Sequence, residues 1–332
     1  MNAETFQTGT DAGRAVVVAL GVVDPSLVAG ILGGGIDFVP VPSDADLAVA
    51  VGAIVRADAT VNAELLDRAP RLRVLARTGV GTDLVDLASA SARGIAVVIT
   101  PGSGTRAVAE GVLAHALHLV KRLSPMTALV REARWADRAG AAVGRIGDLD
   151  GATMGIVGYG RIGRRVGELA RAFGMRVLAH DPFVAPPPDV ECPNLAELAA
   201  ASHLLTLHAP LTEDNYHLVD AEFIGRMRPG AILINCGRGA LVDLNAVLAA
   251  LESGQLAGGG FDVFESEPPQ HHPLFDHPGV SLTPHVMGLT RRATAATFAE
   301  AAQGVLDVLA GRRPAAVANP NWTEMKGRST CV

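Results

Sequence analysis

Short apolar runs alternate with amphipathic segments along residues 15–100. The apolar runs read AVVVALG, DFVPV, GAIVR, RVLART and AVVIT, and a helical pattern, NAELLDRAP, lies between two of them. Such alternation is typical of βαβ units, in which helices bury a parallel sheet. It predicts an α/β domain in the N-terminal part of the chain.

A second series of the same kind follows residues 136–150, a stretch rich in glycine and alanine that we interpret as a connection. Its expected strands are TMGIVGYG, MRVLAHD, HLLTLHAP, AILINC, GGGFDVF and VSLTPH. Strands this apolar are buried on both faces, as in a doubly wound sheet. The predicted fold class is therefore α/β, with two domains built on parallel sheets.

Two long helices are predicted outside these series. The segment TRAVAEGVLAHALHLVKR, residues 105–122, has helical composition and few polar residues, so we expect it to be buried between domains or subunits. A final helix over about residues 290–310 is expected to return to the first lobe, and the polar tail from Thr323 is expected to fray.

Composition narrows the class of protein. The length of 332 residues is typical of about two domains. The net charge of −6 argues against electrostatic binding to nucleic acid or an anionic membrane. Apolar runs such as Ala15–Val23 are far shorter than the roughly 20 residues of a membrane helix, and the N-terminus lacks a basic signal-peptide region. We therefore expect a cytoplasmic protein.

The cysteines and two helical histidines give no metal-binding pattern. Cys192, Cys236 and Cys331 are an odd set without CxxC spacing, so we interpret them as structural thiols. His115 and His118 share one face of the 105–122 helix, but no carboxylate or cysteine there completes a metal site. We interpret both histidines as packing or interface residues and predict no metal.

A glycine-rich turn opens the second series. Gly158, Gly160 and Gly163, in GYGRIG, follow an apolar strand and begin a helix. The next strand ends in Asp181, 18 residues beyond Gly163. The glycines suit a tight turn against a pyrophosphate, the helix N-terminus supplies N–H donors, and Asp181 suits the ribose hydroxyls, so NAD is favoured over NADP. The alternative is an ordinary βαβ turn in which Asp181 caps a helix or turn.

Three ionisable residues lie at the expected carboxyl ends of strands in this second series. Arg238, Glu267 and His285 are 29 and then 18 residues apart. Hydride transfer to a 2-oxo acid needs a proton donor at the carbonyl oxygen and a cation for the carboxylate. A histidine beside a carboxylate suits the first role and the planar arginine fork suits the second. Alternatively, the arginine lies in a polar loop, the glutamate belongs to a solvated patch with Glu265, and the histidine caps a strand end.

The chain resembles the D-isomer-specific 2-hydroxyacid dehydrogenase family over nearly all of its length. The segments that carry the resemblance are RTGVGTDLVDLASASARGIAVVITPG, TRAVAEGVLAHAL, LDGATMGIVGYGRIG, HDP, LHAPLT, NCGRGALVD, FDVFESEP and TPHVMG. The resemblance implies two Rossmann-like domains. Residues 1–104 plus 290–332 would form the substrate domain, and residues 105–289 would form an NAD-binding domain inserted into it.

The resemblance also implies roles for individual residues. Arg238 would anchor the substrate, His285 would be the acid/base, and Glu267 rather than Glu265 would pair with His285. The residues expected to contact the substrate through backbone N–H groups are Gly79, Val80 and Gly81. Those expected to contact the cofactor are Val80, Gly158, Gly160, Arg161, Ile162, Gly163, Asp181, His208, Ala209, Pro210, Cys236, Gly237, Asp262 and Gly288. The helix after Thr105 resembles the family's dimerisation segment, so a homodimer is expected.

Substrate identity is less constrained. The N-terminal segment especially resembles phosphoglycerate dehydrogenases, which have arginines where Arg56 and Arg77 stand, and two cations suit a phosphate, a phosphonate or a second carboxylate. Leu84 and Ile99 stand where the family often has asparagine, so the pocket is expected to differ in shape. Glyoxylate or hydroxypyruvate reduction, phosphite oxidation and an NAD-sensing corepressor are the alternatives. We expect no regulatory C-terminal domain.

Overall fold

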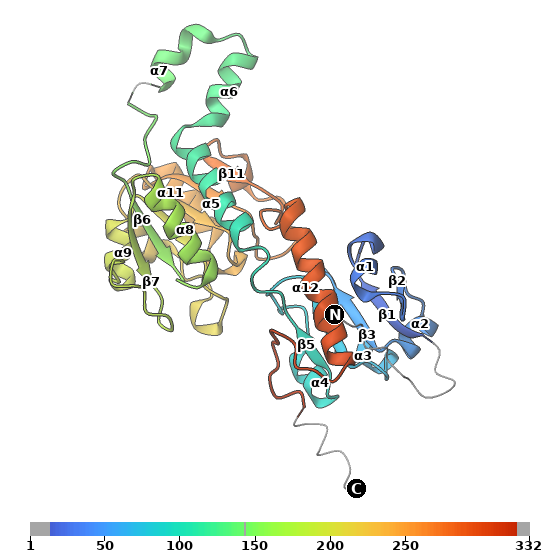
Figure 1. Ribbon diagram of the computed structural model, residues 1–332. Helices are drawn as coiled ribbons and strands as arrows, with labels where there is room; N and C mark the ends of the chain where they lie inside the picture. The colour runs from blue at the N-terminus through green and yellow to red at the C-terminus, as the bar shows by residue number, and fades with distance from the viewer. Residues whose placement is uncertain (1–13, 143, 324–332) are drawn as a thin grey trace. The chain divides into compact units, whose positions relative to one another are not determined.

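The computed structural model describes residues 14–142 and 144–323 (Figure 1). The chain divides into two compact units, one of Met1–Gly104 with Arg291–Val332 and the other of Thr105–Thr290. Cys331 and the tail after Thr323 lie outside the described residues.

The first unit is a five-stranded parallel sheet with the strand order β2-β1-β3-β4-β5. Its strands are β1 (Ala15–Leu20), β2 (Ile36–Val39), β3 (Gly52–Val55), β4 (Val74–Arg77) and β5 (Ala96–Val98). Its helices are α1 (Ala29–Leu32), α2 (Asp44–Val49), α3 (Ala63–Arg68), α4 (Leu87–Ala92) and α12 (Arg291–Leu309), with a 3-10 turn at Pro25–Leu27.

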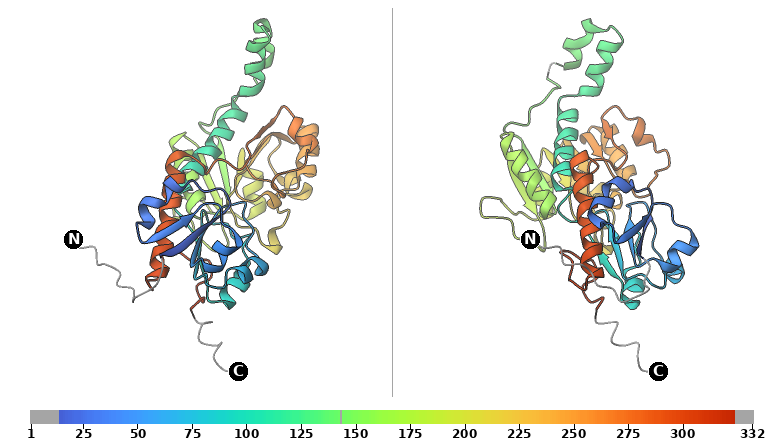
Figure 2. Two further views of the ribbon diagram at one scale, coloured as in Figure 1. Left: turned by 90° about the vertical axis from the view of Figure 1, so that its right-hand side faces the viewer. Right: turned by 45° about the vertical axis from the view of Figure 1, so that its right-hand side comes forward.

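Helices cover both faces of this sheet. One apolar core includes Val17, Ile54 and Val74 and is closed by Phe298 and Val305 of α12. The opposite core lies beneath the short helices α2, α3 and α4. The C-terminal helix thus completes a sheet whose strands all come from the start of the chain, and Figure 2 shows α12 along that sheet.

The second unit is a six-stranded parallel sheet with the strand order β11-β10-β9-β8-β6-β7. Its strands are β6 (Thr153–Val157), β7 (Arg176–His180), β8 (Leu204–Leu207), β9 (Ala231–Asn235), β10 (Leu256–Phe261) and β11 (Val280–Leu282). Every residue of β6, β8 and β9 is buried, as their continuous apolar sequences predict.

Helices also cover both faces of the second sheet. They are α5 (Thr105–Val120), α6 (Leu123–Arg131), α7 (Arg138–Ala142), α8 (Arg161–Ala172), α9 (Leu195–Ala201), α10 (Ala221–Arg226) and α11 (Leu244–Ser253). One core lies beneath α5 and α8, and the other beneath α9, α10 and α11. The predicted fold class, two α/β domains with parallel sheets, is confirmed.

The segment before β6 differs from the sequence prediction. Residues 136–150 were expected to be a connection, but they contain α7, and α6 precedes them. The helix α7 has the sequence RAGAA, which carries no apolar period, although its alanines favour the helical backbone. Figure 1 shows α6 and α7 extending from the end of α5, away from the sheet of this unit.

Strand order identifies where this unit could bind a ligand. The chain passes from β6 to β7 on one side and then returns to place β8 on the other side of β6. In doubly wound sheets, ligands bind outside the carboxyl ends of strands at such a reversal. The turn after β6 therefore lies at the expected binding position. None of the described helices is long and apolar enough to cross a membrane.

Candidate active site

The glycine-rich turn lies at this reversal of strand order. Gly158 has a φ of +90°, and a Cβ there would lie 2.5 Å from the backbone nitrogen of Ala209. A Cβ at Gly163 would lie 2.1 Å from the carbonyl oxygen of Gly158. A side chain at Gly158 would push the turn after β6 away from the residues that follow β8. A side chain at Gly163 would push α8 away from the turn that precedes it. Glycine is therefore required at both.

The N-terminus of α8 suits an anion. No described side chain caps Gly160, the residue before the helix, and a Cβ there would meet no described heavy atom within 4 Å. Arg161 and Ile162 are the first two residues of α8. Because the first N–H groups of a helix lack intrahelical acceptors, they can donate to a phosphate in this open space. The turn thus fits a dinucleotide pyrophosphate.

Asp181, which follows β7, holds the glycine-rich turn. Its Oδ2 accepts a hydrogen bond of 2.7 Å from the backbone N–H of Tyr159, and its Oδ1 accepts from Phe183 (2.8 Å) and Val184 (3.0 Å). Asp181 is therefore a turn-capping residue in this structure. A carboxylate can accept more bonds than these three, so it retains capacity for ribose hydroxyls.

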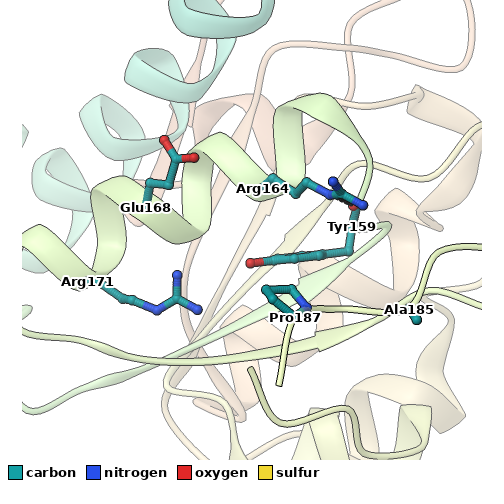
Figure 3. Close-up of a pocket in the computed structure, with 6 residues that line it drawn as sticks. All are labelled: Tyr159, Arg164, Glu168, Arg171, Ala185 and Pro187. Carbon is teal, nitrogen blue, oxygen red and sulfur yellow. Dashed lines mark hydrogen bonds between the residues drawn. The ribbon is translucent and has the colours of Figure 1, made fainter. Parts of the chain in front are cut away.

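A shallow pocket lies between α8 and the loop after β7 (Figure 3). In Figure 3, Arg164 and Arg171 extend from α8 on either side of Tyr159. The pocket is lined by Tyr159, Arg164, Glu168, Arg171, Ala185 and Pro187. None of these is a predicted site residue, and Arg171 pairs with Asp189 (3.2 Å). This pocket therefore does not mark the predicted active site.

The residues expected to enclose the adenosine follow β8. His208 and Ala209 lie against Gly158, and Pro210 comes next. The Nε2 of His208 lies 3.0 Å from the Thr206 hydroxyl. Burial lowers the pKa of His208 to about 3, so its ring is neutral at neutral pH.

This lowered pKa makes the protein's stability depend on pH. Between pH 6.5 and about 3, the histidine takes up a proton in the unfolded chain but not in the folded protein. The free energy of unfolding therefore falls as the pH falls through this range, by up to about 1.4 kcal/mol per pH unit for one proton. We expect His208→Gln to reduce this slope in urea unfolding measured between pH 6 and pH 4. Equal slopes in the two proteins would contradict the expectation.

A buried asparagine shapes the turn that carries Arg238. Asn235, the last residue of β9, is 0% exposed; its amide donates to the carbonyl of Arg238 (2.8 Å) and accepts from the N–H of Gly237 (3.0 Å). The Arg238 Nη1 donates to the carbonyl of Gly237 (2.9 Å). Cys236 is buried, and burial raises the pKa of its thiol, which argues against a nucleophile.

His285 pairs with Glu267. The Nδ1 of His285 lies 2.6 Å from Oε2 of Glu267, whose Oε1 accepts from the N–H of Phe264 (3.0 Å). The neighbouring Glu265 instead accepts from the Tyr216 hydroxyl (2.6 Å) and lies 3.3 Å from Nε2 of His217. Because the Glu267 carboxylate can accept a hydrogen bond from Nδ1–H, the Nε2 of His285 is left available to a substrate.

Asp262 holds the loop that carries His285. Its carboxylate accepts hydrogen bonds from the N–H groups of Val286 (2.9 Å) and Met287 (3.2 Å), and its carbonyl accepts from the N–H of His285 (2.8 Å). His285 has a φ of +54°, in the left-handed region. Such a backbone costs free energy in a non-glycine residue and persists only where its surroundings fix it. Gly288 closes the loop beside α5, with Val108 Cγ2 3.7 Å from where its Cβ would be.

The other predicted residues lie in the first unit, at the carboxyl ends of the adjacent strands β3 and β4. Arg77 is 6% exposed and donates from Nη2 to the carbonyl of Ala57 (3.3 Å). The Arg56 guanidinium lies 5.5 Å from the centre of the Phe298 ring. Gly79, Val80 and Gly81 form the turn after β4. The structure brings the two arginines and this turn to one edge of the first sheet.

Sequence reasoning missed two residues that support the site. Asn235 fixes the Arg238 turn. The sequence signal that could have identified it is a polar residue at the end of an otherwise apolar strand. Thr283 donates from its hydroxyl to Asp262 (2.6 Å), a contact without a local sequence signal. Among residues 14–142 and 144–323, no cluster of three His, Cys, Asp or Glu side chains could hold a metal ion.

The fold and the site together define a class of protein. A doubly wound parallel sheet with a glycine-rich turn at its reversal is a dinucleotide-binding domain. The sequence model of the D-isomer specific 2-hydroxyacid dehydrogenase NAD binding domain matches residues 113–287. The chain therefore belongs to the D-isomer specific 2-hydroxyacid dehydrogenase family, and its second unit is an NAD-binding domain, as the motifs predicted.

Three relatives illustrate the range of the family. A D-3-phosphoglycerate dehydrogenase of Mycobacterium tuberculosis is 37% identical over 78% of this chain and 49% of its own length. A glyoxylate reductase of Thermococcus litoralis is 38% identical over 70% of this chain and 72% of its own. The crystal structure of an NADPH-dependent glyoxylate/hydroxypyruvate reductase from Sinorhizobium meliloti has a TM-score of 0.83 and 29% identity, covering 92% of this chain and 99% of that one. This chain spans about half the length of the D-3-phosphoglycerate dehydrogenases it matches.

Proposed function

We propose that the protein is an NAD-dependent oxidoreductase that interconverts a 2-oxo acid and a D-2-hydroxy acid. The observation that carries this proposal is the contact of 2.6 Å between His285 Nδ1 and Glu267 Oε2. This pair lies in the NAD-binding unit, after β10 and β11, and the Arg238 turn follows the neighbouring strand β9. A proton-transfer pair and a carboxylate anchor thus follow the three successive strands β9, β10 and β11 of one sheet, and 2-oxo acid chemistry requires both groups.

Each side chain has a distinct task in the proposed reaction. The glycine-rich turn would hold NAD, which would supply the hydride for reduction or take it up in oxidation. The Arg238 guanidinium binds the substrate carboxylate with its planar fork and orients the carbonyl carbon. His285 delivers a proton from Nε2 to the carbonyl oxygen during reduction and removes it during oxidation, while Glu267 holds Nδ1–H and stabilises the charged ring.

The substrate is proposed to carry a second anionic group, such as the phosphate of 3-phosphoglycerate or a phosphonate. Arg56 and Arg77 support this because both lie at one edge of the first sheet, beside the Gly79–Gly81 turn. The phosphoglycerate dehydrogenase relatives point the same way. Glyoxylate or hydroxypyruvate reduction is the second candidate, favoured by the glyoxylate reductase relative, which matches over more of its own length.

A substrate screen tests the proposal. NADH oxidation would be followed with hydroxypyruvate and 3-phosphohydroxypyruvate, two acids that differ only in a phosphate. A kcat/KM at least tenfold higher for the phosphorylated acid supports the anionic-tail substrate, whereas the reverse ratio supports the simple 2-oxo acid. NAD reduction by phosphite alone would instead indicate a phosphite dehydrogenase. Tight NAD binding without any turnover would favour a corepressor and contradict the enzymatic proposal.

We further propose that Asp181 selects NAD over NADP. Replacing Asp181 with alanine removes an acceptor for the ribose hydroxyls and the charge that repels a 2′-phosphate. The ratio of kcat/KM for NADH to that for NADPH should fall by roughly tenfold or more, the effect of losing a charged hydrogen bond. Asp189→Asn, in the same loop but paired with Arg171, is the matched control. An unchanged ratio in Asp181→Ala would contradict the ribose role.

A homodimer and a cytoplasmic location stay predictions. Two apolar side chains beyond the end of α5, Val130 and Trp135, are each 62% exposed, which supports a subunit interface there. Light scattering should then give a particle mass near twice the 34.2 kDa of one chain. A mass equal to one chain would contradict the dimer.

A further inference from the structure

His115 is a buried histidine that the proposed reaction does not use. It lies on α5, is 2% exposed, and packs against β10. A Cβ at Gly260 would lie 2.9 Å from the Cβ of His115, so the strand makes room for the imidazole only because glycine stands there. A large polar ring is thus accommodated where an apolar side chain could have filled the core.

Both ring nitrogens of His115 have partners near the His285 loop. Nδ1 lies 2.9 Å from the hydroxyl of Ser281 in β11, and Nε2 lies 3.3 Å from the hydroxyl of Thr283. The Thr283 hydroxyl also lies 2.6 Å from Oδ1 of Asp262. A continuous chain of hydrogen bonds therefore runs from α5 to the carboxylate that holds the backbone of Val286 and Met287.

The protons available to each group decide which atom donates and which accepts in this series of hydrogen bonds. An ionised carboxylate only accepts hydrogen bonds, so the single proton of the Thr283 hydroxyl is donated to Asp262. Thr283 must then accept from His115, which places the ring proton on Nε2. Nδ1 is consequently an acceptor, and Ser281 donates to it. Burial lowers the pKa of His115, which agrees with a neutral ring in this one tautomer.

We infer that His115 is a positioning residue for proton transfer: through Thr283 it orients the Asp262 carboxylate that holds the His285 loop. This inference rests on the proposed function, in which His285 is the acid/base. His115 does not touch the reacting atoms. His115 acts on the reaction through the backbone of His285. That backbone is left-handed, and such a conformation persists only where surrounding contacts fix it. Small displacements of a catalytic group have large effects on rate.

The test compares His115→Leu with a matched control on the same helix. His115→Leu fills the core with an apolar side chain but removes both hydrogen bonds, and kcat should fall roughly tenfold. The control is His118→Leu, because His118 contacts Ser124 (2.8 Å) and not the His285 loop. Its kcat should stay within twofold of the unaltered protein. A normal kcat in His115→Leu would overturn the inference.

A double-mutant cycle distinguishes positioning from general loss of packing. Thr283→Val removes the hydroxyl that links His115 to Asp262, so adding His115→Leu to that variant should change kcat less than twofold. Thr283→Ser keeps the hydroxyl and should retain most of kcat. The inference would be overturned if the losses of kcat in His115→Leu and Thr283→Val multiply in the double variant. It would also be overturned if Thr283→Ser loses as much kcat as Thr283→Val. These readouts also serve if His115→Leu fails to fold, since His115→Met, which likewise lacks the two ring nitrogens, can replace it in the cycle.

Turnover by the unaltered protein distinguishes a failure of this inference from a failure of the proposed function. If it turns over a 2-oxo acid but kcat does not respond to His115, the inference alone fails. If it turns over no 2-oxo acid, the proposed function fails and the inference fails with it.

Discussion

Replacing His285 with alanine is expected to lower kcat for the preferred 2-oxo acid by at least about 100-fold, the usual loss for a general acid/base. The substitution removes the imidazole that the structure pairs with Glu267 and leaves the glycine-rich turn and Asp181 in place. The Kd for NADH should therefore change little. Steady-state kinetics and NADH fluorescence titration measure the two quantities separately.

Two controls sharpen this expectation. His271 also pairs with a carboxylate, Asp276 (3.2 Å), but lies in an exposed loop, so His271→Ala should leave kcat unchanged. Glu267→Gln should reduce kcat, whereas Glu265→Gln should reduce it much less, because Glu265 contacts Tyr216 and His217 instead. Near-normal turnover in His285→Ala, or equal losses in the two glutamate variants, would contradict the acid/base assignment.

Replacing Arg238 with lysine is expected to reduce kcat/KM for the 2-oxo acid by roughly 100-fold. Lysine keeps the positive charge, but a point charge cannot reproduce two parallel N–H···O bonds to one carboxylate. A loss of this size equals about 2.7 kcal/mol, within the range for losing charge-assisted hydrogen bonds. The Kd for NADH should stay near its original value, since the contact of the neighbouring turn residues with a cofactor would be through backbone.

Arg226→Lys is the matched control for this substitution. Arg226 belongs to the same unit and forms an exposed ion pair with Glu222 on α10. Its replacement should leave both kcat and KM unchanged, because exposed ion pairs contribute little. If Arg238→Lys retains its kcat/KM, the arginine serves only to shape its own turn through the bond to Gly237.

Much of the fold was predictable because its signals are local. Strands such as AILIN are apolar up to their last residue and are fully buried in the structure. The helix that follows the Arg238 turn begins where Asp243 accepts hydrogen bonds from Asn245 and Ala246, and it ends at Gly254 in a left-handed conformation. The segment before β6 was predicted less well, since α7 consists of arginine, glycine and alanine and so has no apolar period.

The candidate site was likewise predictable only where its signals are local. The residues that would do chemistry stand at strand ends and were named from their types and spacing. The pairing of His285 with Glu267 rather than Glu265 was expected only from the family resemblance, and the contact of 2.6 Å now supports it. The role of Asp181 as a cap for the glycine-rich turn was left open by the sequence, because an aspartate after a strand suits a ribose and a turn equally well.

By itself, the sequence determined the fold class, the family and the use of NAD, since apolar periodicity, glycine spacing and strand-end motifs are all read within short windows. Only the tertiary structure decided how the His285 loop is held. Thr283 reaches Asp262 across 21 residues and His115 across 168, and His115 comes from a helix on the face of the sheet. Hydrogen bonds between residues so distant in the chain depend on side-chain positions that packing sets, and no local pattern encodes them.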